Sequence, residues 1–339
     1  MDQRRFFAFF TISIAIWYLW YLVLVPKLFP IPPRPAARPA AVASADFSVP
    51  ADALQPANVG AEAPVSDSLP KHPAKTIWLG PQDGSADEKQ LEEFFLAVKL
   101  DSRGACIDTI ELTDRDRYPA FGRRDNRLRV VGSGFGTTMR TFELTIPEVD
   151  DALERDSLSQ ASWEIAAQTD TSVTFRQKSP DGHWELTKHY ELSKLTDNEL
   201  KLTDVRDTLA RGYQLKLTVG MKNLTSQAQE VSYTLRGPVG VPLEDADNTY
   251  KYRDVRMGFV EEDGTTIDES KLAAGDVVKK VKANKTELSK RPIKYIGVDV
   301  LYFAALVLPL GNQLENRTVE HSNCVVVSED KKYPQYSDV

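Results

Sequence analysis

The chain begins with an apolar segment and, after a proline-rich stretch, changes to a pattern in which apolar and polar residues alternate. Residues Phe6–Val25 contain no charge, no glycine and no proline, and eight of them are aromatic. At about 1.5 Å per residue, a helix of this length spans the roughly 30 Å hydrocarbon core of a bilayer. The pattern predicts a transmembrane helix over residues 6–25, preceded by a short cytoplasmic tip of residues 1–5.

Three interpretations of this apolar segment compete. A cleaved signal peptide has an apolar region of about 7–15 residues that ends close to a small-x-small site. Here the only good site of that kind, Ala43–Ala45, lies far downstream. A buried core helix rarely stands at an extreme N-terminus with so many aromatic residues. We therefore predict an uncleaved signal anchor, with everything after residue 25 outside the cytoplasmic membrane. Positive charges on the two sides are near parity, and Arg4 and Arg5 decide this orientation.

The segment of residues 26–75 is predicted to be a disordered linker. Residues 26–73 hold 11 of the 20 prolines and many alanines. Proline removes backbone donors and favours polyproline II, so this composition is typical of a tether. A ligand for a proline-recognition domain is the alternative, and a spacer that holds a domain away from the membrane is favoured over it.

From residue 76 onward, apolar and polar residues alternate as in half-buried strands. The clearest run places five apolar residues on one face: Tyr213, Leu215, Leu217, Val219 and Met221. A second run, interrupted by Lys188, has four on one face: Trp184, Leu186, Tyr190 and Leu192. Shorter runs are Val173 with Phe175, and Val231, Tyr233 and Leu235 before Gly237-Pro238.

The last long apolar run is Leu301–Leu308, which follows the alternating residues Ile296, Val298 and Val300. Its continuous apolar character predicts a strand buried on both faces. Helical signals are few and are confined to Asp87–Leu96 and Asp150–Leu158. The predicted fold is mainly β: an antiparallel sandwich over residues 76–330 with a few short helices, followed by a tail of residues 331–339.

Charge and cysteine content narrow the function classes. The net charge is −7 and no basic stripe appears, which argues against a nucleic-acid partner. Cys106 and Cys324 are the only cysteines. An exported location permits a disulfide between them. Two unpaired buried thiols are favoured instead, because two distant cysteines carry no information about geometry.

The sequence predicts no catalytic, cofactor-binding or metal-binding residue. None of the four histidines, His72, His183, His189 and His321, stands at metal-ligand spacing from another histidine or a cysteine. Gly132–Gly136 is glycine-rich but lacks the lysine and helix of a phosphate loop, so we predict a flexible loop. Asp245 and Asp247 lack the glycine of a calcium loop. These absences favour a binding or assembly module over an enzyme.

Several short motifs occur in a fixed order along residues 1–325. They are Arg4-Arg5 before the aromatic span, the Pro/Ala tether, Trp78-Leu79-Gly80, the strand–turn–strand Leu96–Leu112, Tyr190-Glu-Leu192 before Tyr213–Met221, Asn223-Leu-Thr225, Leu235-Arg-Gly-Pro-Val-Gly240 and Asp299–Pro309. In this order the chain resembles the N-terminal part of the bacterial membrane protein insertase family YidC.

The resemblance implies a large periplasmic domain, a β-supersandwich related in fold to galactose mutarotases. It implies a location in the bacterial inner membrane and a role in insertion, folding and assembly of membrane proteins, alone or with the Sec translocon. The implied partners are the lipid bilayer, Sec translocon components and nascent membrane proteins. In the family, insertion belongs to five C-terminal transmembrane helices, and nothing after Phe303–Leu308 supplies them. Five further apolar spans in the reading frame beyond Val339 would agree with the family, whereas a stop codon there would leave a split or degenerate version.

A membrane-anchored carbohydrate-binding or mutarotase-like protein is the alternative. That function needs a cleft in which a histidine and a carboxylate face a sugar, such as His183 or His189 with Glu185 or Glu191. Strand alternation puts Glu185 and His189 on the side opposite Trp184, where they are also compatible with a solvated polar face. A sandwich that only tethers is a third possibility.

Overall fold

A computed structural model describes residues 72–82, 93–114, 119–120, 123–132, 139–150, 157–200, 210–241, 252–328 and 335–338. The chain divides into two compact units, Met1–Ala61 and Glu62–Val339, and all described residues belong to the second. The tip, the predicted transmembrane helix and most of the linker lie outside these ranges. Within these ranges, no helix is long and apolar enough to cross a membrane.

The first sheet has four antiparallel strands in the order β1-β2-β3-β6. Their bounds are Thr76–Leu79, Leu96–Asp101, Cys106–Leu112 and Arg129–Gly132. A tight turn joins β2 to β3, with Gly104 and Ala105 at positive φ values of 67° and 47°. This confirms the strand–turn–strand predicted over Leu96–Leu112.

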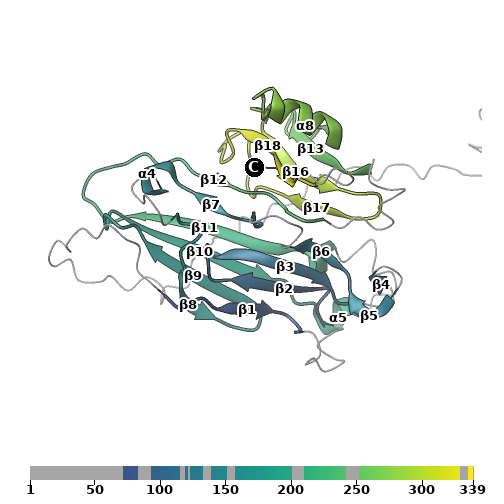
Figure 1. Cartoon of the computed structure of the whole chain (residues 1–339), viewed down its shortest axis with the longest axis horizontal. Coiled ribbons are helices and arrows are strands. Elements are labelled where there is room, and N and C mark those ends of the chain that lie inside the picture. Colours follow the sequence, from purple (N-terminus) through teal and green to yellow (C-terminus); the bar gives the residue numbers. More distant parts are fainter. Residues whose placement is uncertain are drawn as a thin grey trace, which may run out of the picture. The chain divides into compact units, whose positions relative to one another are not determined.

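The second sheet is also antiparallel and has the order β11-β10-β9-β8 (Figure 1). In chain order the strands are β8 (Glu164–Gln168), β9 (Ser172–Lys178), β10 (Trp184–Leu192) and β11 (Leu215–Asn223). The predicted apolar face of β10 is confirmed, because Trp184, Leu186, Tyr190 and Leu192 are all buried. On β11 four of the five predicted residues pack against the core, whereas Tyr213 lies in the preceding 3-10 turn η3 (Ala210–Tyr213).

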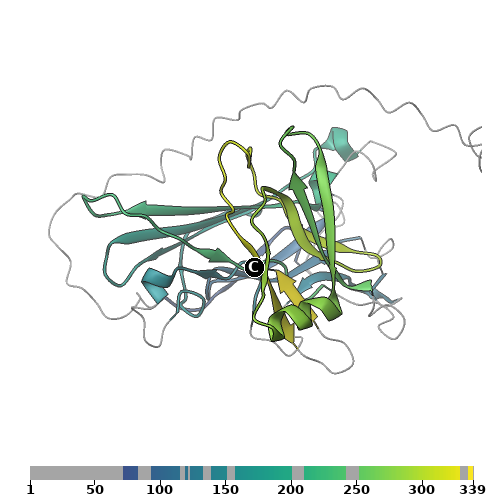
Figure 2. The ribbon, with the colours of Figure 1, turned by 90° about the horizontal axis from the view of Figure 1, so that it is seen from above.

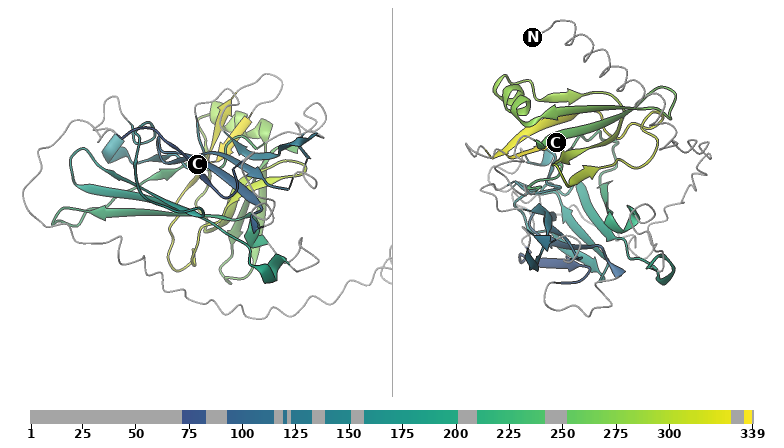
Figure 3. Two further views of the ribbon diagram at one scale, coloured as in Figure 1. Left: turned by 90° about the horizontal axis from the view of Figure 1, so that it is seen from below. Right: turned by 90° about the vertical axis from the view of Figure 1, so that its right-hand side faces the viewer.

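One hydrophobic core joins these two sheets, whose strands lie close together in Figure 3. It contains Leu79, Val98 and Ile107 from the first sheet and Phe175 and Tyr190 from the second. Because alternate residues of each strand point to the same face, the polar residues between these positions lie on the outer faces. The described part of the chain is therefore a mainly antiparallel β structure, as predicted.

Short elements connect and flank the two sheets. They are β4 (Pro119–Ala120), β5 (Arg123–Arg127), β7 (Leu144–Thr145), α4 (Pro147–Asp150), α5 (Asp197–Leu200) and β12 (Thr234–Leu235). The strand predicted around Val231–Leu235 is thus only two residues long, and it pairs with β7. The helix predicted over Asp150–Leu158 shares only Asp150 with α4, and residues 151–156 lie outside the described ranges.

A third sheet has the order β14-β13-β16-β17, all antiparallel. Its strands are β13 (Asp254–Val260), β14 (Ile267–Ala273), β16 (Ile293–Asp299) and β17 (Ala304–Val307). Its inner face packs against helix α8 (Ala274–Lys282) and β18 (Ser322–Ser328), which lie side by side in Figure 2. Strands β15 (Glu287–Ser289) and β19 (Gln335–Asp338) pair with β18.

Three features of this region differ from the sequence expectation. The prediction that Leu301–Leu308 is one strand buried on both faces is wrong: Leu301 and Tyr302 form an exposed turn, and β17 is a half-exposed edge strand. Helix α8 was not predicted, although Val277, Val278 and Val281 form its apolar stripe. Part of the expected tail, Gln335–Asp338, is strand β19.

Candidate interaction surface

The β16–β17 hairpin exposes several large apolar side chains. Val300 and Phe303 close its turn, with the Val300 amide donating to the Phe303 carbonyl at 2.7 Å. Beyond the turn, the exposed side chains continue along β17 and the segment after it. Exposed fractions are 66% for Tyr302, 40% for Leu306, 52% for Leu308 and 65% for Leu310. We call Leu301–Leu310 the β17 surface.

The inner side of this hairpin is fixed by packing. Phe303 and Ala305 contact the core shared by the first two sheets, and they also contact a small buried cluster formed by Val241, Val298 and Val300. Alternation then places Ala304 and Leu306 on the opposite face. The exposure of Leu306 is therefore a consequence of register, because its two neighbours on β17 are turned inward.

Gly297 explains why few side chains of its own sheet contact Leu306. The two residues are partners in the β16–β17 register. Gly297 has no side chain, and a Cβ there would collide with the Ala305 carbonyl oxygen. The neighbouring side chain on β13, Arg256, turns to Asp299, with Nε 2.7 Å from Oδ2. The outer face beside Leu306 is therefore left open.

The two edges of the third sheet differ in charge. Edge strand β14 carries Asp268, Glu269 and Lys271, whereas β17 has the uncharged sequence Ala-Ala-Leu-Val. No charged residue occurs anywhere in Val300–Leu314. Natural sheets protect exposed edges with short strands, charges, proline or bulges. β17 is short and is followed by Pro309, but it has no charge, and several large apolar side chains are exposed along it and beyond it. Clustered exposed apolar side chains are typical of interaction sites.

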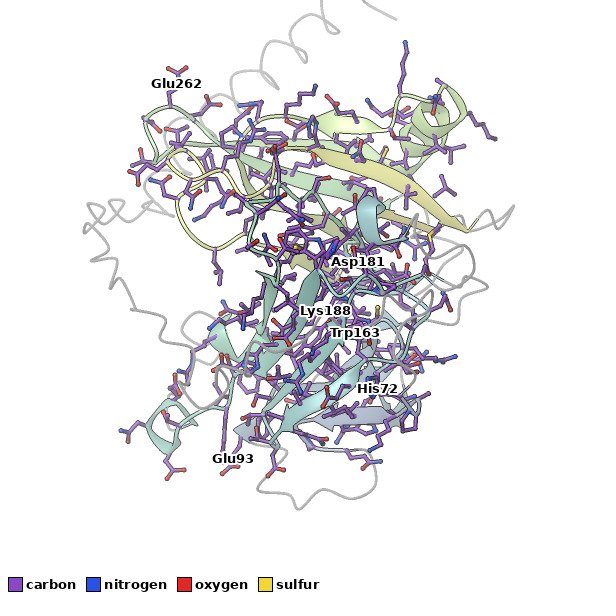
Figure 4. All side chains as sticks on the ribbon, turned by 90° about the vertical axis from the view of Figure 1, so that its left-hand side faces the viewer. His72, Glu93, Trp163, Asp181, Lys188 and Glu262 are labelled. Atoms are coloured by element: carbon purple, nitrogen blue, oxygen red, sulfur yellow. The ribbon has the colours of Figure 1, made fainter. Side chains whose placement is uncertain are left out.

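A buried lysine is the most unusual polar group of the core. Lys188 interrupts the apolar face of β10, yet it is fully buried. Its ammonium donates to the carbonyl oxygens of Gly104, Ala105 and Phe142 at 2.9, 3.3 and 2.6 Å. It also lies 5.4 Å from the Trp163 ring centroid, and Figure 4 shows these two residues close together.

The contacts of Lys188 indicate a structural role. Carbonyl oxygens only accept hydrogen bonds, so three of them match the three donors of an ammonium group. Burial lowers the pKa of Lys188, as expected for a charge removed from water. The same turn receives the Tyr190 hydroxyl, which donates to the Ala105 carbonyl at 2.7 Å. Lys188 and Tyr190 thus fasten β10 to the β2–β3 turn.

An ion-pair network continues outward from this turn. Arg140 donates to the Arg103 and Ser159 carbonyls at 2.7 and 2.5 Å, and its guanidinium lies 3.6 Å from Asp101. Glu143 then links Arg140, 3.7 Å away, to Arg236 at 2.9 Å. These groups satisfy one another, so the network joins loops rather than presenting a reactive group.

The histidines do not form a site. His189 lies on the outer face of β10, where its Nδ1 is 2.8 Å from the Thr174 hydroxyl, and burial lowers its pKa. His183 lies in the β9–β10 turn, 3.1 Å from Asp181, and His321 lies 3.6 Å from Glu287. Each of these three histidines therefore has a local polar partner.

The carboxylates proposed for a sugar site are on the outer face as predicted. Glu185 shares that face with His189, with Thr187 between them, and Glu191 pairs with Lys216 at 3.3 Å. Alternation of β10 is confirmed here too, since Trp184 and Tyr190 point into the core.

The remaining features considered in the sequence are the two cysteines, metal ligands and the residues near a possible calcium or phosphate loop. Cys106 and Cys324 are both buried free thiols, as favoured, and burial raises the pKa of each. Among the described residues, no group of three or more histidine, cysteine or carboxylate side chains is placed to hold a metal ion. Asp245, Asp247 and residues 133–136 lie outside the described ranges.

The β17 surface was missed because its turn lacks a sequence signal. Leu301 and Tyr302 are not turn-forming residues, so the apolar run looked like one continuous strand. The absence of charge over Val300–Leu314 was visible and was the available clue. Comparison of the whole chain with known proteins gives no match to a protein-family model or to a curated protein sequence.

Proposed function

We propose that this chain is the membrane-anchored, exported N-terminal part of a YidC-like membrane protein insertase. In this proposal, residues 6–25 anchor the chain in the bacterial inner membrane and residues 26–75 tether the domain on the periplasmic side. The β domain has the β-supersandwich fold related to galactose mutarotases. It acts as a contact domain for Sec translocon components or nascent membrane proteins, and has no catalytic role.

The positions of the shared motifs support this proposal. Trp78-Leu79-Gly80 ends β1, with Gly80 at a positive φ of 76°. The motif beginning at Leu235 supplies Arg236, which pairs with Glu143, and the buried residues 237–240. The last motif forms the β16–β17 hairpin. The motifs therefore lie at turns and loop contacts, and residues at such positions hold the strands of a fold in their order along the chain.

The single observation that carries the contact role is the β17 surface. It combines large exposed apolar side chains, a complete absence of charge and a sheet edge with which no strand pairs in the part of the chain that the structure describes. On a domain tethered to a membrane, such a surface favours contact with another apolar chain. Lys188, Tyr190 and the Arg140–Glu143–Arg236 network, in contrast, find their partners within the domain, which favours a structural role for these groups.

Co-purification from membranes tests the proposal. The full chain is expressed in bacteria, extracted in mild detergent and probed for translocon subunits. We expect these subunits with the wild type and with the control Ile267→Lys, which alters an exposed residue at the opposite edge. The double variant Leu306→Lys/Leu308→Lys should recover at least fivefold less. Equal recovery with all three proteins, or none with the wild type, would count against the proposal.

A further inference from the structure

We propose that β17 binds an extended, uncharged apolar peptide segment as an additional antiparallel strand. This inference rests on the proposed contact function and specifies the class of partner and the mode of recognition. The occupant is an unfolded stretch of another polypeptide, rich in apolar residues at alternate positions. It extends the third sheet beyond its β17 edge.

The hydrogen-bond pattern of the β16–β17 hairpin shows which backbone groups of β17 would bind the added strand. Val300 and Phe303 form a hydrogen-bonded pair at the turn. Because hydrogen-bonded and non-hydrogen-bonded pairs alternate in an antiparallel ladder, Ala305 and Val307 face β16 with their backbone groups. The N–H and C=O of Leu306 therefore point away from β16. In the described part of the chain, no strand pairs with that side.

Side chains complement this edge on the outer face. Leu306 lies on the outer face of β17, and Leu308 is the first residue after the strand. They are 40% and 52% exposed, so an added strand can bury both against its own alternate residues. In such strand addition, backbone hydrogen bonds supply affinity and alternate side chains supply selectivity. A charged incoming segment would lose solvation here without gaining an ion pair.

Two other occupants fit this edge less well. An anionic lipid surface attracts clusters of lysine and arginine, and Val300–Leu314 contains neither. A second copy of the chain pairing through β17 would share a strand of only four residues. A stable protein interface buries about 1,200–2,000 Å² in total, which is more than so short a strand provides.

Peptide binding to the full chain in detergent tests the inference. The probe is a fluorescent eight-residue peptide of alternating valine and threonine with blocked ends. Its control carries N-methyl groups on all inner residues, which removes the donors from both edges of the peptide without adding charge. We expect saturable binding of the first peptide, measured by fluorescence anisotropy, and at least tenfold weaker binding of the second. Equal binding of both peptides would overturn strand addition.

Two substitutions at Leu306 separate the contribution of its backbone N–H to peptide binding from the contribution of its side chain. Leu306→Pro removes the N–H that points away from β16 and leaves every hydrogen bond between β16 and β17 in place. It should weaken peptide binding about tenfold, the loss expected when one backbone hydrogen bond to the peptide is removed. Leu306→Val keeps the N–H and should bind within about twofold of wild type, as a β-branched residue suits a strand. Circular dichroism checks that both variants fold. If Leu306→Pro fails to fold, the methylated peptide still decides the question on the wild type.

The outcomes distinguish this inference from the proposed function. No peptide binding, with translocon subunits still recovered from membranes, overturns strand addition and leaves the contact function standing. Peptide binding without recovery of any membrane protein supports strand addition and overturns the contact function. Self-association through β17, measured by light scattering and abolished by Leu306→Pro, would replace the peptide by a second copy and overturn the inference.

Discussion

Lys188 and Tyr190 show, at the scale of single residues, how two polar side chains on one buried strand face fix a turn of the opposite sheet. Both reach the Ala105 carbonyl, at 3.3 and 2.7 Å. Ala105 has a positive φ of 47°, which a non-glycine residue adopts only when its surroundings enforce it. The hydrogen bonds from Lys188 and Tyr190 to its carbonyl help to hold Ala105 in this conformation. The alternation of the sequence showed that Lys188 lies on the apolar face, but the three carbonyls that accept from it come from distant segments.

Replacing Lys188 with methionine should destabilise the domain by about 1–3 kcal/mol, because the Gly104, Ala105 and Phe142 carbonyls lose a buried donor. Methionine fills much of the same space and avoids a cavity. Urea unfolding followed by tryptophan fluorescence gives the free energy. The matched control is Lys216→Met, at a partly exposed position on β11, for which a change within about 0.5 kcal/mol is expected. An equal effect of the two changes would refute the anchoring role.

Tyr190 should make stability depend on pH in the alkaline range. Burial raises its pKa well above the ordinary tyrosine value of 10.0. Since the unfolded phenol ionises first, the contribution of Tyr190 is complete below pH 10.0 and is lost as the pH rises further. Tyr190→Phe should cost about 1 kcal/mol near neutral pH through the lost hydrogen bond.

Above pH 10.0, that difference should shrink by up to about 1.4 kcal/mol per pH unit. Unfolding of wild type and Tyr190→Phe at a series of pH values checks this. Burial also raises the pKa of Cys106 and lowers the pKa of Lys188, and both groups are present in both proteins. The comparison therefore isolates what Tyr190 adds, which includes the repulsion between its phenolate and the Cys106 thiolate. A constant difference across the alkaline range would contradict the assignment.

At the scale of elements, the long alternating strands were predictable and the short ones were not. On β10 and β11 the pattern of five or more alternating positions gave both the strand and its buried face. The turn at Leu301 and Tyr302 and strand β17 were predicted as a single strand, Leu301–Leu308, because Leu301 and Tyr302 resemble strand residues and only tertiary packing bends the chain there. Helix α8 is short, and its valines also favour strands.

Gly297 should be essential for the close pairing of β16 and β17. A Cβ on this residue would collide with the backbone of Ala305 and Leu306, which cannot rotate away as a side chain can. We expect Gly297→Ala to lower the free energy of unfolding by about 1–3 kcal/mol. Hydrogen exchange of the Ala305 and Val307 amides should accelerate in the same variant.

Gly275 provides the matched control. It lies in α8, and a Cβ there would meet nothing within 4 Å. Gly275→Ala should therefore raise stability by about 0.4–1 kcal/mol, because alanine has fewer unfolded conformations and a higher helix propensity. Destabilisation by both glycine substitutions would indicate that the effect at Gly297 is not specific to the hairpin.

At the scale of the whole molecule, the sequence predicted a mainly antiparallel β domain, which the structure confirms, and a membrane anchor over residues 6–25, which lie outside the described ranges. It predicted no chemical site. The structure adds a location for contact, since the β17 surface is the place where apolar side chains, an open edge and the absence of charge coincide. This surface exists only because β17 is the edge strand of its sheet. Sheet order is a long-range property that alternation along one strand does not encode.

Site-specific photocrosslinking in intact bacterial membranes tests the central claim most directly. A photoreactive amino acid replaces Leu306 in the full chain, and in the control it replaces Ile267, which is exposed on the opposite edge of the same sheet. We predict crosslinks from position 306 to translocon subunits or nascent membrane proteins, at least fivefold above those from position 267. Equal crosslinking at both positions, or none at 306, would contradict a contact function for the β17 surface.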